Sequence, residues 1–156
     1  MLIKHIEIEE INLPQSQNRI VVKILSCGIC ISEVKVYQQE QSHYFKPSIA
    51  LGYEYVGTTV NRYKNGYFKK RDRIAIVHAV NCGYCNYCQR GLLKLYKNKQ
   101  RLSNEGFDQY FSMDTESANQ SLIKLSENIS PNESTFLEPI ACCIESINLS
   151  KNAILN

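Results

Sequence analysis

Hydrophobic and polar residues alternate with the two-residue period of β-strands at residues 2–9 and 106–111, whereas residues 19–29 and 73–77 are continuous β-branched and apolar runs typical of buried strands. The runs are separated by Gly, Pro, Asn and Ser, which is typical of strands joined by turns. We predict strands at residues 2–9, 19–29, 51–60, 73–77, 106–111 and 122–125. Gly57 interrupts the third of these runs and predicts a bulge or a close approach of another backbone. Many short strands of this kind predict a partly open β-barrel or a sandwich.

Other stretches follow helical signals instead. Ser32 is the predicted N-cap of a short helix, and Glu33 would interact favourably with the helix dipole in its first turn. Ser130 is the predicted cap of a second helix that opens with Pro131. A third helix is predicted at 140–147, and an apolar strand would begin at 153–155. The fold class is therefore mainly β with a few short helices.

Size, charge and composition narrow the class of protein. A chain of 156 residues, 44% hydrophobic and 21% charged, is expected to form one soluble globular domain. The net charge of +3 is small, and the Lys and Arg residues are scattered except at Lys69-Lys70-Arg71, so no nucleic-acid partner is expected. No apolar stretch approaches the roughly 20 residues that cross a bilayer, and the N-terminus lacks a signal peptide, so we expect a cytoplasmic protein without a membrane partner.

Three of the seven cysteines, Cys82, Cys85 and Cys88, lie at three-residue intervals in one short segment. Thiolates at this spacing can converge on one zinc ion, and a reducing compartment favours metal binding over disulfides. No Cys occurs between Cys88 and Cys142, and no His follows His78. His78 can serve as a fourth ligand or be an ordinary polar residue at a strand end. Zinc completed by water or another side chain and an empty, reduced loop both remain open.

Four ordered segments, at 27–33, 51–57, 82–91 and 137–139, together resemble a known family. They are similar to the N-terminal, GroES-like catalytic domain of the medium-chain dehydrogenase/reductase family, the zinc-dependent alcohol and polyol dehydrogenases. The resemblance implies a GroES-like, partly open β-barrel over residues 1–150, with a cysteine-rich lobe at 80–101.

The resemblance also implies roles for individual residues. Cys30 matches the thiolate ligand of the catalytic zinc, Ser32 matches the hydroxyl that relays the substrate proton, and Glu33 stands where the family usually has Asp. Glu54 and Glu138 match further residues of the catalytic site, so the implied ligand set is Cys30, Glu54 and Glu138. Zinc in such a site lowers the pKa of an alcohol before hydride leaves for the nicotinamide.

Two tyrosines depart from the family pattern. Tyr53 stands where zinc-dependent members have a His ligand, and a phenol, which ionises only near about pH 10, is a poor zinc ligand. Tyr96 stands eight residues after Cys88, where the structural-zinc lobe has its fourth Cys. Tyr53 can be a hydrogen-bond donor in a zinc-free site or a packed aromatic residue. Zinc is therefore an expected cofactor at the catalytic-type and structural-type sites, with the occupancy of each left open.

The resemblance implies an alcohol or polyol dehydrogenase that transfers hydride between an alcohol or carbonyl substrate and NAD or NADP. Family members bind the dinucleotide in a Rossmann domain, and no Gly-x-Gly-x-x-Gly motif occurs in this chain. We expect residues 151–156 to begin that domain, the chain alone to be inactive, and the full-length protein to be a candidate homo-oligomer. The alternative hypothesis is a degenerate, zinc-poor domain that binds a small molecule or partner without chemistry.

Overall fold

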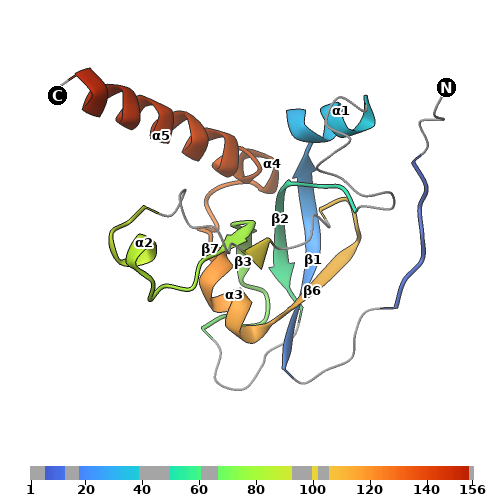
Figure 1. Cartoon of the computed structure of the whole chain (residues 1–156). Helices are drawn as coiled ribbons and strands as arrows, with labels where there is room; N and C mark the ends of the chain where they lie inside the picture. Colours follow the sequence, from blue (N-terminus) through green and yellow to red (C-terminus); the bar gives the residue numbers. More distant parts are fainter. Residues whose placement is uncertain are drawn as a thin grey trace.

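The computed structural model describes residues 6–12, 18–38, 50–60, 67–92, 100–101 and 106–154. Its main layer is an antiparallel sheet in the order β6-β1-β2-β3-β7 (Figure 1). The strands are β1 (Arg19–Gly28), β2 (Glu54–Thr59), β3 (Arg73–Ile76), β6 (Tyr110–Asp114) and β7 (Leu122–Lys124). The sheet is not closed, because β6 and β7 form its two edges among the described strands. The predicted mainly β, partly open architecture is confirmed.

The hydrophobic core lies on one face of this sheet. Ile20 and Val22 of β1 are fully buried, as expected for positions two residues apart on a strand, and Ile74 of β3 is fully buried beside them. Phe111 of β6 completes this layer. These buried positions lie in the continuous β-branched and apolar runs of the sequence, which is why β1 and β3 could be predicted.

Gly57 is a point of close approach, as predicted. It pairs with Ile24 of β1, and a Cβ added at Gly57 would lie 2.6 Å from the carbonyl oxygen of Lys23. The irregularity in the pairing falls on β1, between Ile24 and Ser26. The glycine therefore allows the two central strands to pack closely, and the bulge is on its partner strand.

Several predicted strand bounds hold and others are corrected. The strands predicted at 19–29, 73–77 and 122–125 correspond to β1, β3 and β7. β2 begins only at Glu54, and β6 lies at 110–114. The predicted strand at 2–9 is wrong for its described part, because residues 6–12 are exposed and belong to no strand. Alternation of hydrophobic and polar residues does not by itself provide the neighbouring strand that a β-strand must pair with.

The helices are α1 (Ile31–Tyr37), α2 (Asn86–Gln89), α3 (Thr115–Ser121), α4 (Pro131–Ser134) and α5 (Leu137–Ile154). Ser130 caps α4 as predicted, and its hydroxyl oxygen accepts the backbone N–H of Glu133 at 3.2 Å. The cap of α1 is Cys30, so the prediction of Ser32 is wrong by two residues. The sequence analysis missed α3, which is capped by the side chain of Asp114 through a 2.8 Å bond from the Ser117 N–H.

α5 is the longest helix and extends away from the sheet (Figure 1). It includes the helix predicted at 140–147 and continues through Ile154, so the strand predicted at 153–155 is wrong for Ala153 and Ile154. α4 packs against β1 and β2, and α5 contacts β2. Among the described residues, no helix is both long and apolar enough to cross a membrane.

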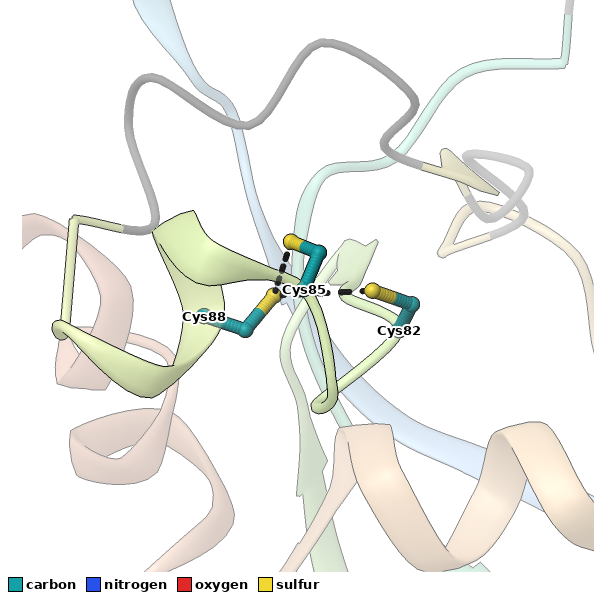
Figure 2. A group of neighbouring side chains, drawn as sticks. All are labelled: Cys82, Cys85 and Cys88. Carbon is teal, nitrogen blue, oxygen red and sulfur yellow. Dashed lines mark hydrogen bonds between the residues drawn. The ribbon is translucent and has the colours of Figure 1, made fainter.

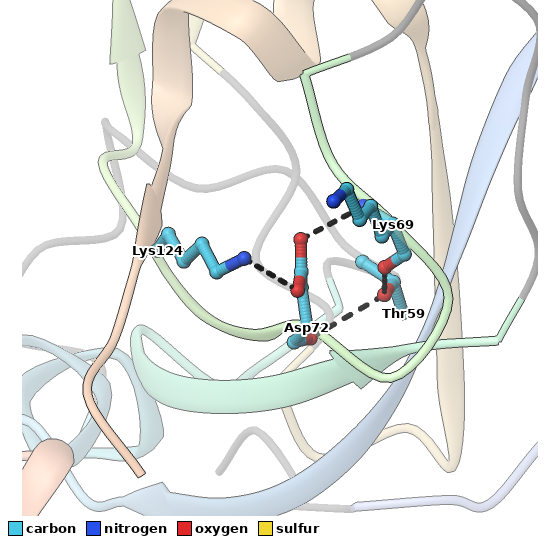
Figure 3. Close-up of polar contacts among 4 residues, drawn as sticks. All are labelled: Thr59, Lys69, Asp72 and Lys124. Atoms are coloured by element: carbon cyan, nitrogen blue, oxygen red, sulfur yellow. Dashed lines mark hydrogen bonds and ion pairs between the residues drawn. The ribbon is translucent and has the colours of Figure 1, made fainter.

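The turn before β3 is held by polar contacts (Figure 3). Oδ2 of Asp72 accepts the backbone N–H of Lys69 at 2.8 Å, and Oδ1 pairs with Nζ of Lys124 at 2.7 Å. The hydroxyl of Thr59 donates to the backbone carbonyl of Lys69. The basic residues 69–71 thus lie in an exposed turn.

Candidate functional site

The C-terminal end of β1 and the N-terminal end of β2 bring together several of the predicted site residues. We call residues 27–33, 52–54 and 78 the carboxylate end of the sheet. Gly28 pairs directly with Glu54 in the β1–β2 ladder. A Cβ added at Gly28 would lie 2.7 Å from Oε2 of Glu54, so the carboxylate of Glu54 lies against the backbone of β1. The absence of a side chain at Gly28 makes room for this carboxylate.

Glu33 ties the carboxylate end together. Only 5% of Glu33 is exposed. Its Oε1 accepts the backbone N–H of Gly52, and its Oε2 accepts the backbone N–H of Cys30 at 2.9 Å. One buried carboxylate therefore joins the start of α1, whose N-cap is Cys30, to the segment before β2, 19 residues further along the chain. Glu33 lies in the first turn of a helix, as predicted from the sequence, but its contact with Gly52 was not predicted.

Cys30 and Ser32 are direct neighbours. The hydroxyl of Ser32 donates a hydrogen bond to Sγ of Cys30 at 3.1 Å, and both side chains are partly buried. Cys30 is thus the N-cap of α1 and also accepts a hydrogen bond from Ser32, which is not the cap. The predicted thiolate and the predicted relay hydroxyl lie side by side.

Cys27 lies in a different environment from Cys30. Burial, together with the charges of Glu33 and Glu54, raises the pKa of Cys27 to about 12. Its Sγ donates to the carbonyl of Gly28 at 3.3 Å and faces Gly106, where an added Cβ would lie 2.8 Å from the sulfur. A thiol with so high a pKa stays protonated at neutral pH and is chemically inert.

Tyr53 and His78 form a stacked pair. Their ring centroids are 4.1 Å apart with an interplanar angle of 21°, and the ring of Tyr55 lies edge-on to His78 at 5.3 Å. His78 is only 6% exposed, and its Nε2–H donates to the backbone carbonyl of Tyr53. Burial lowers the pKa of His78 to about 4, so the imidazole is neutral. The sequence placed His78 at a strand end but gave no sign that it packs on Tyr53.

Glu138 lies in the first turn of α5, partly buried, and its Oε1 accepts the thiol of Cys142 at 3.4 Å. Figure 1 shows the start of α5 near the end of the sheet that carries α1. The hydroxyl of Ser26 in β1 donates a 2.8 Å hydrogen bond to Oδ1 of Asn132, which ties α4 to this end of the sheet. Glu138 is thus positioned at the same end of the molecule as Cys30 and Glu54.

The three expected catalytic-type ligands do not converge on one point. Among the described residues, the only group of three or more Cys, His, Asp or Glu ligand atoms that lie within 4.8 Å of one another is in the cysteine segment. Cys30, Glu54 and Glu138 form no such group, and Tyr53 packs on His78 where the family has a ligand. These ligand atoms are therefore not preorganised for a zinc ion at the carboxylate end.

The cysteine segment itself does bring its three thiols together. We call residues 81–92 the cysteine lobe. Sγ of Cys88 lies 3.4 Å from Sγ of Cys85 and 3.8 Å from Sγ of Cys82 (Figure 2). Zinc–sulfur bonds of about 2.3 Å in tetrahedral geometry require sulfur separations of about 3.8 Å, so these thiols fit three corners of a zinc site. Tyr96 lies outside the described residues.

Local backbone geometry produces this arrangement. Gly83 and Gly91 adopt left-handed φ angles of +76° and +69°, which turn the chain on both sides of the four-residue helix α2. Cys85 is the N-cap of α2, and Cys88 lies within it. A small sheet of β4 (Ala79–Val80) and β5 (Gln100–Arg101) stands at the base of the lobe. His78 is held by Tyr53 and does not join the thiols.

Two dehydrogenases are similar to this chain over most of its length. The sorbitol dehydrogenase of Bacillus subtilis is 24% identical over 95% of this chain, and the scyllo-inosose 3-dehydrogenase of Thermotoga maritima is 26% identical over 96%. The chain spans 43% and 42% of the lengths of these two dehydrogenases.

Solved structures show the same architecture. The galactitol-1-phosphate dehydrogenase of Escherichia coli matches 92% of this chain and 41% of its own with a TM-score of 0.76 at 22% identity. A protein from Sinorhizobium meliloti whose crystal structure contains NADP matches 89% of this chain and 40% of its own, with a TM-score of 0.72 at 25% identity.

A family model agrees with both comparisons. The model of the alcohol dehydrogenase GroES-like domain matches residues 16–126, which include β1, α1, β2, the cysteine lobe and β6. This match covers more than half of the sequence, and it includes both the carboxylate end and the cysteine lobe. The chain belongs to the alcohol dehydrogenase GroES-like domain family.

Proposed function

We propose that this chain is the substrate-side domain of a longer NAD(P)-dependent oxidoreductase that acts on a small alcohol, polyol or carbonyl compound. The observation that carries the proposal is the Ser32 to Cys30 hydrogen bond at the carboxylate end, held in place by Glu33. The family match and the polyol dehydrogenase relatives support the class of reaction. The nicotinamide would be bound by a Rossmann domain outside these 156 residues, so the chain alone is proposed to be inactive.

The proposed reaction needs a group that moves one proton. In the reducing direction, a bound nicotinamide would supply the hydride for the carbonyl carbon, and the carbonyl oxygen would then take a proton to become a hydroxyl. Ser32 is the proposed donor of that proton, and its O–H would rotate from Sγ of Cys30, 3.1 Å away, toward the carbonyl oxygen. Glu54 provides the carboxylate through which the proton is replaced from solvent. Oxidation of the alcohol reverses these steps.

The proposal includes no zinc at the carboxylate end. Cys30, Glu54 and Glu138 are the residues that match the family's ligands, but their ligand atoms do not converge in the described structure. Every step is therefore assigned to side chains of this chain and to the nicotinamide. Zinc, as the family suggests, is assigned to the cysteine lobe alone.

The alternative is a binding module without redox chemistry. The observation that favours it is the stacking of Tyr53 on His78, which places packed aromatic rings where the family has a metal ligand. Under this alternative the same end of the sheet would bind a small molecule or a partner, and Ser32 would have no chemical role.

The test uses the natural polypeptide that contains this chain. It is assayed for NADH and NADPH oxidation against a panel of ketoses and for the reverse reaction with polyols, while bound zinc is counted by atomic emission. We expect turnover, loss of at least about tenfold in kcat for Ser32→Ala, and little change for Cys27→Ser, whose thiol is inert. Absence of turnover with every substrate and either nucleotide would favour the binding module.

The zinc count tests the metal assignment separately. One equivalent that disappears in Cys85→Ser and persists in Glu138→Gln is expected. A second equivalent that is lost in Glu138→Gln would show a catalytic-type zinc and overturn the metal-free assignment of the carboxylate end.

A further inference from the structure

The cysteine lobe has three thiols but no fourth cysteine. The sequence contains no Cys between Cys88 and Cys142 and no His after His78. Within the part of the chain that the structure describes, the ligand group contains Cys82, Cys85 and Cys88 only. His78, the nearest imidazole in sequence, is buried against Tyr53 and donates its Nε2–H there.

Among the described residues, the geometry leaves one corner of a tetrahedron without a Cys, His, Asp or Glu ligand. The sulfur separations of 3.4 and 3.8 Å are close to the roughly 3.8 Å that three thiolates adopt around one tetrahedral zinc. Cys82, Cys85 and Cys88 are all partly exposed. Within the described parts of the chain, the three thiols are therefore accessible to a small ligand.

Zinc sites follow a rule that distinguishes closed from open coordination. Structural sites normally have four protein ligands, whereas sites with three protein ligands keep a fourth position for water or another exchangeable ligand. Thiolate-rich sites prefer soft donors, so a thiolate is the external ligand that such a position favours most. The cysteine lobe has the ligand count of an open site.

We propose that Cys82, Cys85 and Cys88 bind zinc as a three-thiolate site whose fourth position is exchangeable and accepts a small-molecule thiol. The site is thereby a ligand-binding position on the metal, in contrast to a closed structural centre. This proposal is independent of the redox function, because it concerns only the cysteine lobe.

The test replaces zinc by Co²⁺ in the purified protein under anaerobic conditions and follows the thiolate-to-cobalt charge-transfer band. Addition of 2-mercaptoethanol is expected to raise the intensity of this band by about one third, because the number of thiolates bound to the cobalt would rise from three to four. Tyr96→Cys is the matched control, because it supplies a cysteine at the position where the resembling family has its fourth. In that variant the band is expected to start at the four-thiolate intensity and to stay unchanged on addition of the thiol.

A second readout uses zinc itself. Transfer of zinc to a chromogenic chelator is expected to be at least about tenfold faster from the natural protein than from Tyr96→Cys, since an open position lets the chelator attack the metal. The proposal is overturned if the natural protein binds no Co²⁺ or if added thiol leaves the intensity of its charge-transfer band unchanged. It is also overturned if the natural protein releases zinc as slowly as Tyr96→Cys does. Circular dichroism of both proteins verifies that each remains folded.

Discussion

At the carboxylate end, the side chains are positioned by residues that are far apart in sequence, whereas in the cysteine lobe the three thiols are brought together within seven residues. Glu33 contacts Gly52, and Tyr53 packs on His78 across 25 positions of the chain. In the lobe, Cys82, Cys85 and Cys88 need only the turns at Gly83 and the helix α2. The first region depends on tertiary packing, and the second depends on local backbone geometry.

This difference determines how each region responds to a changed residue. At the carboxylate end, Tyr53 is partly buried and stacks on the buried His78, whose pKa is lowered to about 4 by its burial. In the lobe, Tyr96 in place of a cysteine leaves the geometry of the other three thiols suited to a metal. A substitution at the carboxylate end thus changes the packing and ionisation of neighbouring side chains. A substitution in the cysteine lobe removes a single metal ligand.

The largest expected effect compares one glycine from each region. Gly52 has φ +109°, and an added Cβ would lie 2.4 Å from the Cα of Gly106, so Gly52→Ala should lower the free energy of unfolding by about 4 kcal/mol. Gly83 has φ +76° with no atoms near an added Cβ, so Gly83→Ala should cost only about 1 kcal/mol. Urea unfolding measures both. Equal losses would contradict the contrast between packed and local structure.

A second effect concerns the pH dependence of stability. The pKa of His78 is about 4 in the folded protein and 6.5 when unperturbed, so the unfolded chain takes up the proton first as pH falls. The contribution of neutral His78 to the free energy of unfolding is therefore fully present above pH 6.5. It falls progressively by about 3 kcal/mol as the pH drops to 4.

The matched variant is His78→Phe, which keeps an aromatic ring beside Tyr53 but does not titrate. Urea unfolding between pH 4 and 7 should show a steeper loss of stability in the natural protein than in this variant. Parallel curves would mean that His78 is not buried as a neutral imidazole.

Alkylation of Cys27 tests the same burial through chemistry. Because its pKa is raised to about 12, iodoacetamide at pH 8 should modify Cys27 at least about a hundredfold more slowly in the folded protein than in urea. Exposed Cys143 of α5 is the internal control and should react at similar rates in both states. Peptide mass spectrometry measures each site. Fast modification of Cys27 in the folded protein would contradict its assigned environment.

The smallest effect lies at the opposite end of β2, outside both regions. Burial alone would raise the pKa of Asp72, but the hydrogen bond with Lys124 and the N–H of Lys69 lower it. The side chain of Lys124 is 45% exposed, so Lys124→Ala should cost only about 0.5 kcal/mol, and less in high salt. Thermal unfolding at two salt concentrations measures this. A loss as large as that of Gly52→Ala would show that charge at the surface matters as much as packing.

Local signals predicted those elements whose determinants are adjacent in sequence. Continuous β-branched and apolar runs predicted β1 and β3, the short run at 122–125 predicted β7, and the pair Ser130 and Pro131 predicted the start of α4. Local signals failed where a distant contact decides the outcome. Ser32 is a good capping residue, yet Cys30 caps α1 because Glu33 binds the Cys30 N–H while it also reaches Gly52. Alternation at 6–9 likewise predicts a strand that has no partner in the described structure.

The sequence by itself determined the spacing of Cys82, Cys85 and Cys88 and the residues available at the carboxylate end, because those depend only on the order of the chain. Tertiary structure alone decided that Tyr53 packs on His78, that Glu33 joins α1 to Gly52, and that the ligand atoms of Cys30, Glu54 and Glu138 form no close group. The physical reason is that burial and hydrogen bonding between distant segments set these positions and ionisation states, and no local pattern records which segments will meet.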